Sequence, residues 1–484
     1  MKELFKKILV ANRAEIAIRV LRACRELGIA SAAVYSDADR DSLHVRYADE
    51  AHRIGTAAPS ESYLNLDRII QVARDCGAEA IHPGYGFLAE RAAFPEACEA
   101  AGLAFIGPPA SAMRVLGSKL EARRLAAKSG VPVTPGSAAL KDPDLSAEAA
   151  RKIGYPVIVK PSGGGGGIGM QVVEKEAELR AAVERSAQAA RSAFGDATVY
   201  LEKYIRHPRH IEIQVICDRQ GHAAHLGERE CSIQRRHQKI MEETPSPALT
   251  AELRARMGAA AVKAAKAAGY VNAGTVEFIF SHGEFYFLEV NARLQVEHPI
   301  TELVTGVDLV KEQIRVAAGH TLSFKQAEVT WTGHAIEMRI NAEDPARRFI
   351  PNPKRIHRWV APGGPGVRVD SGFGPGSEVP PNYDSLLAKL IVHGADRAEA
   401  IARGRRALSE FLVVGPATTI AYHQAILESA DFKAGRLSTR FIDDHPELVD
   451  AAQKFLGRRS PFDYGPDPRH VAAAAAAVAT VMKA

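Results

Sequence analysis

A run of five consecutive glycines, in KPSGGGGGIGM at residues 160–170, constrains the fold of this chain more than any other short feature. It lies between two strand-like stretches, YPVIVK and MQVV, and Lys160 precedes the glycines. A Walker A loop runs from a strand into a helix and has its lysine after the last glycine, so this sequence does not fit that geometry. A glycine-rich turn between antiparallel strands can still close over phosphates, because glycine lets backbone N–H groups approach a ligand. The alternative is a flexible surface turn.

The first 115 residues alternate between strand and helix patterns. KKILVAN reads as a buried strand, RAEIAIRVLRACRELG as a helix that ends on Gly28, and IASAAVYS and AEAIHPGYG as further strands. This alternation predicts an α/β region with a parallel sheet. The turn after the first strand, ANRAEI, lacks the GxGxxG pattern, so we expect a Rossmann-like layout without dinucleotide binding.

The overall charge excludes one broad class of function. The chain has 62 Lys and Arg against 57 Asp and Glu, a net charge of +5 over 484 residues, which argues against a nucleic-acid protein held by bulk charge. We see no signal peptide, and no run reaches about 18 apolar residues without charges. Five cysteines without CxxC spacing argue against a disulfide framework or structural zinc and fit a reducing cytoplasm.

Two carboxylates stand out in the hairpin GTVEFIFSHGEFYFLEVNARL. If its turn is the three residues 282–284, then Ser281 pairs with Phe285 and Glu277 faces Glu289. Like charges directly opposite each other among apolar neighbours are costly, so a cation should lie between them. Mg²⁺ is the natural candidate, and Asn291 could add an oxygen. The alternatives are a neutralising Arg or Lys, or a shifted register.

Two later stretches are dense in polar side chains. NARLQVEHPITE, at 291–302, follows the hairpin, and ECSIQRRHQK, at 230–239, packs Gln234, Arg235, Arg236, His237 and Lys239 into one stretch. A small-anion site would need an Arg to bind the anion and a Glu to act as a base. A solvated basic surface is the alternative for the second stretch.

At this point the chain resembles the biotin carboxylase branch of the ATP-grasp enzymes over roughly residues 4–445. The resemblance rests on eight strings in order: ILVANRAEIAIR, HPGYGFLAE, GSK, GGGGGIGM, RHIEIQV, CSIQRRHQK, NARLQVEHPITE and RINAED. It implies an α/β (α+β overall) chain with an ATP-grasp fold. The expected parts are a Rossmann-like domain at 1–115, an ATP-grasp domain at 116–330 with a lid at about 131–204, a β-rich C-terminal domain at 331–445, and an extension at 446–484.

The resemblance also implies a reaction and roles for named residues. Bicarbonate would attack MgATP to give carboxyphosphate, and biotin on a separate carrier would be carboxylated. Glu297 would be the general base on bicarbonate, and Arg339 would stabilise the enolate of biotin. Nucleotide contacts would come from Lys119, Lys160, Gly164, Gly165, Gly166, Gly167, Glu202, Lys203, Ile205, His210, Gln234 and His237. Bicarbonate would be held by Lys239, Arg293, Gln295, the backbone of Val296 and Glu297, and Mg²⁺ or Mn²⁺ by Glu277, Glu289 and Asn291.

The sequence departs from the family pattern at three positions. Ile168 stands where Arg or Lys is common, Ala14 where Gly is usual, and Ala292 where Thr is common. The first change removes either one expected contact between the lid and phosphate or only a surface interaction. Cys231 lies within the inferred site, and we interpret it as a packed thiol, because this reaction needs no covalent nucleophile.

Two other functions compete with a biotin carboxylase. One is an ATP-grasp ligase for a different carboxylate, which RLQVEH and RINAED disfavour; the other is a non-catalytic nucleotide-binding subunit, which the full set of inferred catalytic side chains disfavours. Lys483, in the terminal VMKA, is not expected to carry biotin. The expected partners are a biotin carboxyl carrier protein, carboxyltransferase subunits and a second copy of the chain. The acyl acceptor stays open among acetyl-CoA, propionyl-CoA, pyruvate and others.

Overall fold

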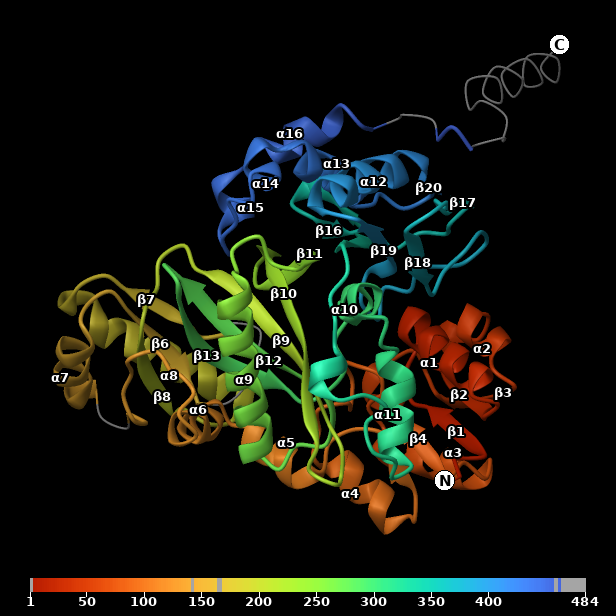
Figure 1. Ribbon diagram of the computed structural model, residues 1–484, viewed down its shortest axis with the longest axis horizontal. Coiled ribbons are helices and arrows are strands. Elements are labelled where there is room, and N and C mark those ends of the chain that lie inside the picture. The colour runs from red at the N-terminus through yellow and green to blue at the C-terminus, as the bar shows by residue number, and fades with distance from the viewer. Residues whose placement is uncertain (1–2, 141–142, 163–167, 457–459, 463–484) are drawn as a thin grey trace.

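The computed structural model describes residues 3–140, 143–162, 168–456 and 460–462 (Figure 1). The glycines at 163–167 and the alanine-rich end with Lys483 lie outside this part of the chain. Every helix within the described residues is too short or too polar to cross a membrane.

The N-terminal region is built on a five-stranded parallel sheet, as the strand–helix alternation predicts. The strand order is β3-β2-β1-β4-β5, with crossover helices between neighbouring strands. The strands are β1 (Lys7–Val10), β2 (Ala30–Ser36), β3 (Glu50–Gly55), β4 (Ala80–His82) and β5 (Ala104–Phe105). The helices are α1 (Ala14–Glu26), α2 (Leu43–Tyr47), α3 (Leu66–Asp75), α4 (Ala93–Ala100) and α5 (Ala110–Gly117). β1 has three fully buried residues, because helices cover the sheet on its faces.

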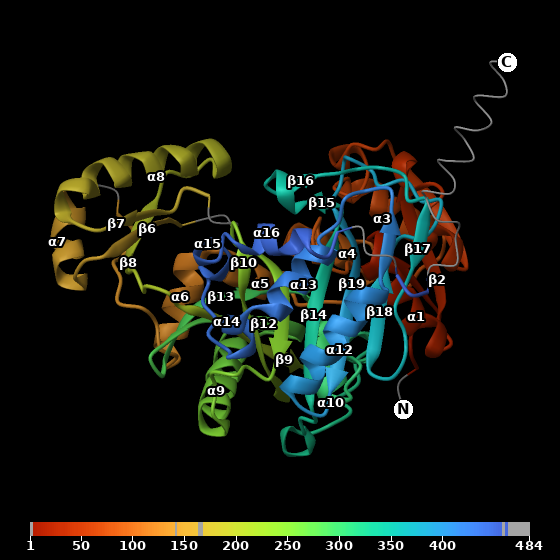
Figure 2. The same cartoon turned by 90° about the horizontal axis from the view of Figure 1, so that it is seen from above.

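A small three-stranded sheet stands apart from the rest of the molecule and forms the lid (Figure 2). The lid comprises α7 (Pro143–Ile153), β6 (Val157–Pro161), β7 (Gln171–Val173), α8 (Leu179–Phe194) and β8 (Val199–Lys203), and α6 (Lys119–Lys128) leads into it. β6 pairs with β7 in antiparallel fashion, so the predicted strands on either side of the glycine run are confirmed. This region has an apolar core of its own.

The centre of the molecule is an eight-stranded antiparallel sheet in the order β13-β12-β9-β10-β11-β14-β19-β18. Its strands are β9 (Arg209–Cys217), β10 (Ala223–Arg235), β11 (Gln238–Thr244), β12 (Asn272–Ser281), β13 (Glu284–Asn291), β14 (His334–Asn341), β18 (Val367–Ser371) and β19 (Leu386–Gly394). The sheet therefore joins strands from the predicted ATP-grasp region to strands from the predicted C-terminal region.

Helices and short strands surround this sheet. The helices are α9 (Ala251–Ala267), α10 (His298–Thr305), α11 (Leu309–Ala317), α12 (Arg397–Glu410), α13 (Ile420–Glu428), α14 (Ala430–Lys433), α15 (Phe441–Asp444) and α16 (Leu448–Gln453). The short strands are β15 (Glu343–Asp344), β16 (Ile350–Pro351), β17 (Arg358–Val360) and β20 (Leu412–Val414). Figure 1 shows α12 and α13 above the long strands, α9 in front of them and α11 beside their lower ends.

The β12–β13 hairpin confirms the predicted pair of carboxylates but corrects its turn. Ser281 pairs with Glu284, so the turn has two residues and not three. His282 and Gly283 have φ of 50° and 83°, the left-handed backbone that such tight turns require. One extra residue, Leu288, then forms a β-bulge that restores the pairing of Glu277 with Glu289. The two departures from the predicted register cancel.

Candidate active site

A cavity of about 740 Å³ lies where the N-terminal region, the lid and the eight-stranded sheet meet. Most of the residues that the sequence nominates line it: Lys119, Lys160, His210, Gln234, His237, Lys239, Glu277, Glu289, Asn291, Arg293, Gln295, Val296, Glu297 and Arg339. These residues come from distant parts of the chain and from several elements. The fold therefore brings together groups that were inferred separately.

Three nominated residues lie on β8 or just after it and do not line this cavity. The carboxylate of Glu202 is buried and accepts hydrogen bonds from Lys160 at 2.7 Å and from the Thr134 hydroxyl at 3.0 Å. The amino group of Lys203 donates to two backbone carbonyls of the lid, each at 2.8 Å. Ile205 is half-buried. Gly164, Gly165, Gly166 and Gly167 lie outside the described residues.

Lys239 is the hub of the site. Its ammonium contacts Glu212 at 2.5 Å, Glu277 at 2.8 Å and Glu297 at 2.8 Å. Burial alone would lower the pKa of Lys239, but the three carboxylates outweigh it and raise that pKa well above its usual value. The ammonium therefore stays charged and holds three acidic groups together.

Glu297 lies between two cations at the start of α10. One carboxylate oxygen contacts Lys239, and the other accepts from Arg339 at 2.9 Å. Burial would raise the pKa of Glu297, but Lys239, Arg339 and Arg229 together hold it well below its ordinary range. Glu297 is therefore ionised in this state and able to accept a proton.

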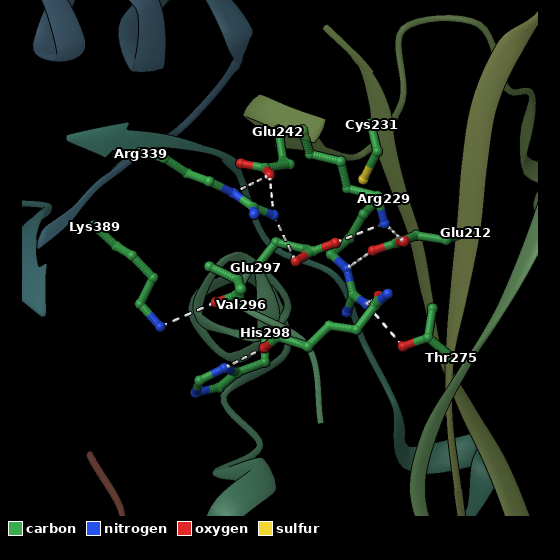
Figure 3. A network of polar contacts seen from close by, with 12 residues as sticks. Glu212, Arg229, Cys231, Glu242, Thr275, Val296, Glu297, His298, Arg339 and Lys389 are labelled. Atoms are coloured by element: carbon green, nitrogen blue, oxygen red, sulfur yellow. Dashed lines mark hydrogen bonds and ion pairs between the residues drawn. The ribbon is translucent and has the colours of Figure 1, made fainter. Parts of the chain in front are cut away.

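Arg339, on strand β14, contacts both Glu297 and Glu242 (Figure 3). Its Nε donates to Glu242 at 2.7 Å, while Nη2 reaches both carboxylates. Burial raises the pKa of Glu242 to about 7, and the charge on Glu297 adds to this effect, although Arg339 opposes it. The sequence interpretation did not nominate Glu242.

Arg229 is a second residue that the sequence interpretation missed. It has no solvent exposure, and its guanidinium donates to Glu212 at 2.5 Å and to Gln295 at 3.0 Å. Its remaining N–H groups donate to Gln214 at 2.7 Å, Thr301 at 3.0 Å and Thr275 at 3.0 Å. All five donors are used, so Arg229 locks these side chains into one arrangement (Figure 3).

Strand pairing provides the signal that could have found Arg229. Arg229 pairs with Glu212, Glu212 with Glu277, and Glu277 with Glu289, so one row of charged side chains crosses β10, β9, β12 and β13. In RHIEIQVIC, polar residues alternate with apolar ones, which marks one polar face on a buried strand. That face belongs to the active site.

In this structure, basic side chains of the same chain contact both Glu277 and Glu289. Glu277 contacts Lys239 and lies 3.0 Å from Nε2 of His210, and Glu289 contacts Lys119 at 3.0 Å. Glu277 stays ionised, since burial is outweighed by Lys239 and His210 and its pKa is held well below the usual value. The neutralising lysine expected as an alternative is thus present. Oxygen donors that face each other across two strands still fit the requirements of Mg²⁺.

The groups nominated for bicarbonate are already oriented by other residues. Arg293 donates to Glu90 at 2.8 Å, and Gln295 donates to Glu277 at 3.1 Å. The carbonyl of Val296 accepts from Lys389 at 3.0 Å. Asn291 directs its amide nitrogen to Glu277 at 2.8 Å and its oxygen to Arg293 at 3.3 Å. Lys389 and Glu90 were not nominated from the sequence.

The remaining nucleotide residues lie along one edge of the cavity. The ring of His210 contacts the amide of Gln234 at 2.8 Å. His237 is exposed in the turn between β10 and β11, with φ of 64°. The Cys231 thiol is fully buried, and burial together with Glu212 and Glu297 raises its pKa well above its usual value. A thiol held protonated in this way is no nucleophile, in agreement with its interpretation as a packed side chain.

Comparison with known proteins gives consistent matches over nearly the whole chain. Residues 4–113 match the family model of the biotin carboxylase N-terminal domain, 118–325 the ATP-binding domain of the carbamoyl-phosphate synthase L chain, and 337–444 the biotin carboxylase C-terminal domain. A pyruvate carboxylase subunit from Methanothermobacter thermautotrophicus is 59% identical over 93% of this chain and 92% of its own. Biotin carboxylase 1 of Bacillus subtilis is 54% identical over 91% of this chain and 99% of its own.

Solved structures agree with these matches. The dimeric biotin carboxylase domain of Hydrogenobacter thermophilus 2-oxoglutarate carboxylase, in complex with MgADP, ADP and bicarbonate, has a TM-score of 0.89 at 48% identity; the match covers 93% of this chain and 99% of that chain. A biotin carboxylase–β-γ-ATP complex from Campylobacter jejuni also has a TM-score of 0.89, at 46% identity, over 91% of this chain and 99% of that chain.

Proposed function

This chain belongs to the biotin carboxylase family, and on that premise we propose how its own residues carry out the family's reaction. The protein is a ligase that uses ATP and bicarbonate to carboxylate biotin. The observation that carries the assignment of residues is the chain of contacts from Lys239 through Glu297 to Arg339. It joins the ammonium of Lys239, an ionised carboxylate and the guanidinium of Arg339 in one row of buried groups.

Glu297 is the proposed general base. It takes the proton of the bicarbonate hydroxyl while a bicarbonate oxygen attacks the γ-phosphorus of ATP, and the bond from that phosphorus to ADP breaks. Lys239 and Arg293 hold the bicarbonate, helped by Gln295 and the backbone of Val296. When bicarbonate takes over a contact of Lys239 with Glu297, the pKa of Glu297 rises and the carboxylate becomes a stronger base.

Arg339 is the proposed stabiliser of biotin. Carboxyphosphate breaks its C–O bond to release CO₂ and phosphate, the released phosphate takes the proton from N1 of biotin, and N1 then bonds to CO₂. The negative charge that develops on the ureido oxygen suits a guanidinium that is always charged and already oriented by Glu242. Burial of the pair strengthens this interaction, because water no longer screens it.

The nucleotide is the proposed ligand of the lid and of the two lysines at its base. Lys119 and Lys160 bind phosphates, and both are now paired with Glu289 and Glu202, respectively. Glu277 and Glu289 would hold the metal ion, and Asn291 would supply a further oxygen. When bound, Mg²⁺ neutralises phosphate charge and orients the γ-phosphoryl group. Lid closure excludes water from the labile carboxyphosphate.

The wider setting of the enzyme follows from the same premise. We propose that the biotin carrier and the carboxyltransferase are separate chains, that the protein forms a homodimer, and that it works in the cytoplasm, where its five free cysteines stay reduced. We keep the division into regions 1–115, 116–330, 331–445 and 446–484 as a proposal, with the second and third sharing the eight-stranded sheet.

Substitution of the base tests this assignment. The Glu297→Gln variant should bind MgATP with normal affinity and lose turnover by about 10²–10⁴-fold, the usual contribution of a general base. The measurement is MgATP affinity by calorimetry beside the rate of carboxybiotin formation. Carboxylation close to the wild-type rate would remove Glu297 from this role.

A further inference from the structure

A basic loop borders the mouth of the active-site cavity. Residues 345–358, PARRFIPNPKRIHR, contain no acidic side chain. Arg347, Arg348 and Lys354 are all exposed, and none of the three makes an ion pair within the described part of the chain, whereas Arg355 lies opposite Glu378 in an isolated β-bridge. Surface cations usually have acidic neighbours on their own chain, so this run of uncompensated charge needs an explanation.

The loop is held in place by one aromatic side chain. Phe349 is buried, with its ring edge-on to Tyr422 at 4.9 Å, and the guanidinium of Arg235 lies over it at 4.5 Å. The backbone N–H of Phe349 donates to the carbonyl of Asp344 at 2.8 Å. Arg348 and Phe349 both have φ of 58°, which turns the chain sharply at this point. The neighbouring cations are therefore presented from a fixed loop, which lowers the entropic cost of binding a partner.

A second cavity connects the loop to the active site. It has a volume of about 640 Å³ and shares Arg235, Gln238, Glu343, Tyr383 and Asp384 with the lining of the active-site cavity. Figure 2 shows β15 and β16, which flank the first part of the loop, on the same side of the molecule as the lid helix α8.

The lining of this second cavity is positively charged. Its cations are Arg235, Arg236, Arg347 and Arg348, and its acids are Glu343 and Asp384. Glu343 is already occupied by Arg235 at 3.4 Å and by the Ser385 hydroxyl at 2.6 Å. Ile350, at 47% exposure, adds an apolar side chain among these charges. A surface of this kind suits a protein partner with an acidic face and an apolar contact.

We propose that this basic loop docks an acidic face of the protein domain that carries biotin, an inference that rests on the proposed function. Biotin on a carrier can reach Arg339 only through the mouth of the active-site cavity, so the carrier must contact the surface around that mouth. Free biotin needs no such contact. The loop thus acts on delivery of biotin and leaves the chemical step unchanged.

A charge-reversal experiment separates delivery from chemistry. The test variant combines Arg347→Glu, Arg348→Glu and Lys354→Glu, and the control variant combines Lys128→Glu, Arg219→Glu and Lys263→Glu, which are also exposed. Both variants and the wild type are assayed with free biotin and with the purified biotinylated carrier protein of the same organism. We expect the test variant alone to lose about tenfold or more in kcat/KM for the carrier, because rim charges control the association rate.

The outcomes are distinct. Unchanged kcat/KM for free biotin in the test variant, with a weaker salt dependence for the carrier than in the wild type, supports docking by charge. Equal losses with free and carrier-bound biotin, or the same loss in the control variant, would overturn the inference, as would normal kinetics with the carrier. If the wild type carboxylates neither form of biotin, the proposed function itself fails.

Discussion

Lys389 donates from a fully buried ammonium to the carbonyl of Val296 at 3.0 Å, and so ties strand β19 to the segment that leads into α10. The same ammonium lies 3.2 Å from Glu15 on α1. One side chain therefore connects the N-terminal region, the central sheet and the segment that holds both Gln295 and Glu297. Figure 3 shows Lys389 on the opposite side of this segment from Arg229.

Replacement of Lys389 should loosen that segment. In Lys389→Met, we expect kcat/KM for bicarbonate to fall by about 10²-fold, since a displacement of about 1 Å can cost that much. MgATP affinity should stay close to normal, because the nucleotide groups lie elsewhere. The free energy of unfolding should fall by about 3–5 kcal/mol, the cost of breaking a buried ion pair. A parallel loss of MgATP affinity, or a normal kcat/KM for bicarbonate, would contradict a positioning role for Lys389. The control is Lys266→Met, which lies on the exposed side of α9.

Glu242 gives a prediction about pH. Its pKa is raised by burial to about 7, so the folded protein binds a proton more tightly than the unfolded chain does. Its contribution to stability is therefore fully present below the unfolded pKa of about 4.3 and is lost as pH rises through the folded pKa. Glutamine mimics the protonated form, so Glu242→Gln should gain stability relative to the wild type between pH 5 and pH 8. Urea unfolding at both pH values measures this, and a difference independent of pH would argue against it.

Substitution of Glu289, the more exposed residue of the Glu277–Glu289 pair, tests whether the pair binds a metal ion. Glu289→Gln should weaken Mn²⁺ binding in the presence of ADP by at least about tenfold, a loss typical of altered metal sites. Electron paramagnetic resonance titration measures free Mn²⁺ directly. Glu284→Gln lies at the exposed end of the same strand and is the matched control. Equal Mn²⁺ affinities in the two variants would mean that Glu289 pairs with Lys119 and does not bind the metal ion.

Ile168 gives the prediction that is specific to this chain. It directly follows the glycine run and is 51% exposed in the structure. Ile168→Arg should tighten MgATP about tenfold if the lid closes as proposed, because a charge-assisted hydrogen bond contributes about 1.5 kcal/mol. Fluorescence titration with a nucleotide analogue measures the change. An unaltered dissociation constant would show that this side chain stays in solvent.

Strand and helix periodicities predicted the parallel N-terminal sheet and the late hairpin, because these patterns are local. The ATP-grasp architecture and most of the cavity lining followed from the resemblance to the biotin carboxylase family. The Glu277–Glu289 pair was correct although the turn was wrong, since neither a left-handed His282 nor a bulge at Leu288 is visible in a residue pattern. Arg229 and Lys389 were missed for another reason. Lys389 is the one lysine in a mostly apolar strand, and Arg229 stands between Glu228 and Glu230 in β10. In both cases the partners become apparent only when the strands are paired. Local sequence therefore nominates groups proposed to touch substrate more readily than groups that orient them.

The stoichiometry of the reaction tests the central claim most directly. Purified protein is incubated with MgATP, labelled bicarbonate and free biotin, and both ADP and labelled carboxybiotin are measured over time. We predict ADP release that depends on bicarbonate, is accelerated by biotin, and is accompanied by carboxybiotin, with both products lost in Glu297→Gln. ADP release that is independent of bicarbonate, or the absence of labelled carboxybiotin, would contradict the assignment.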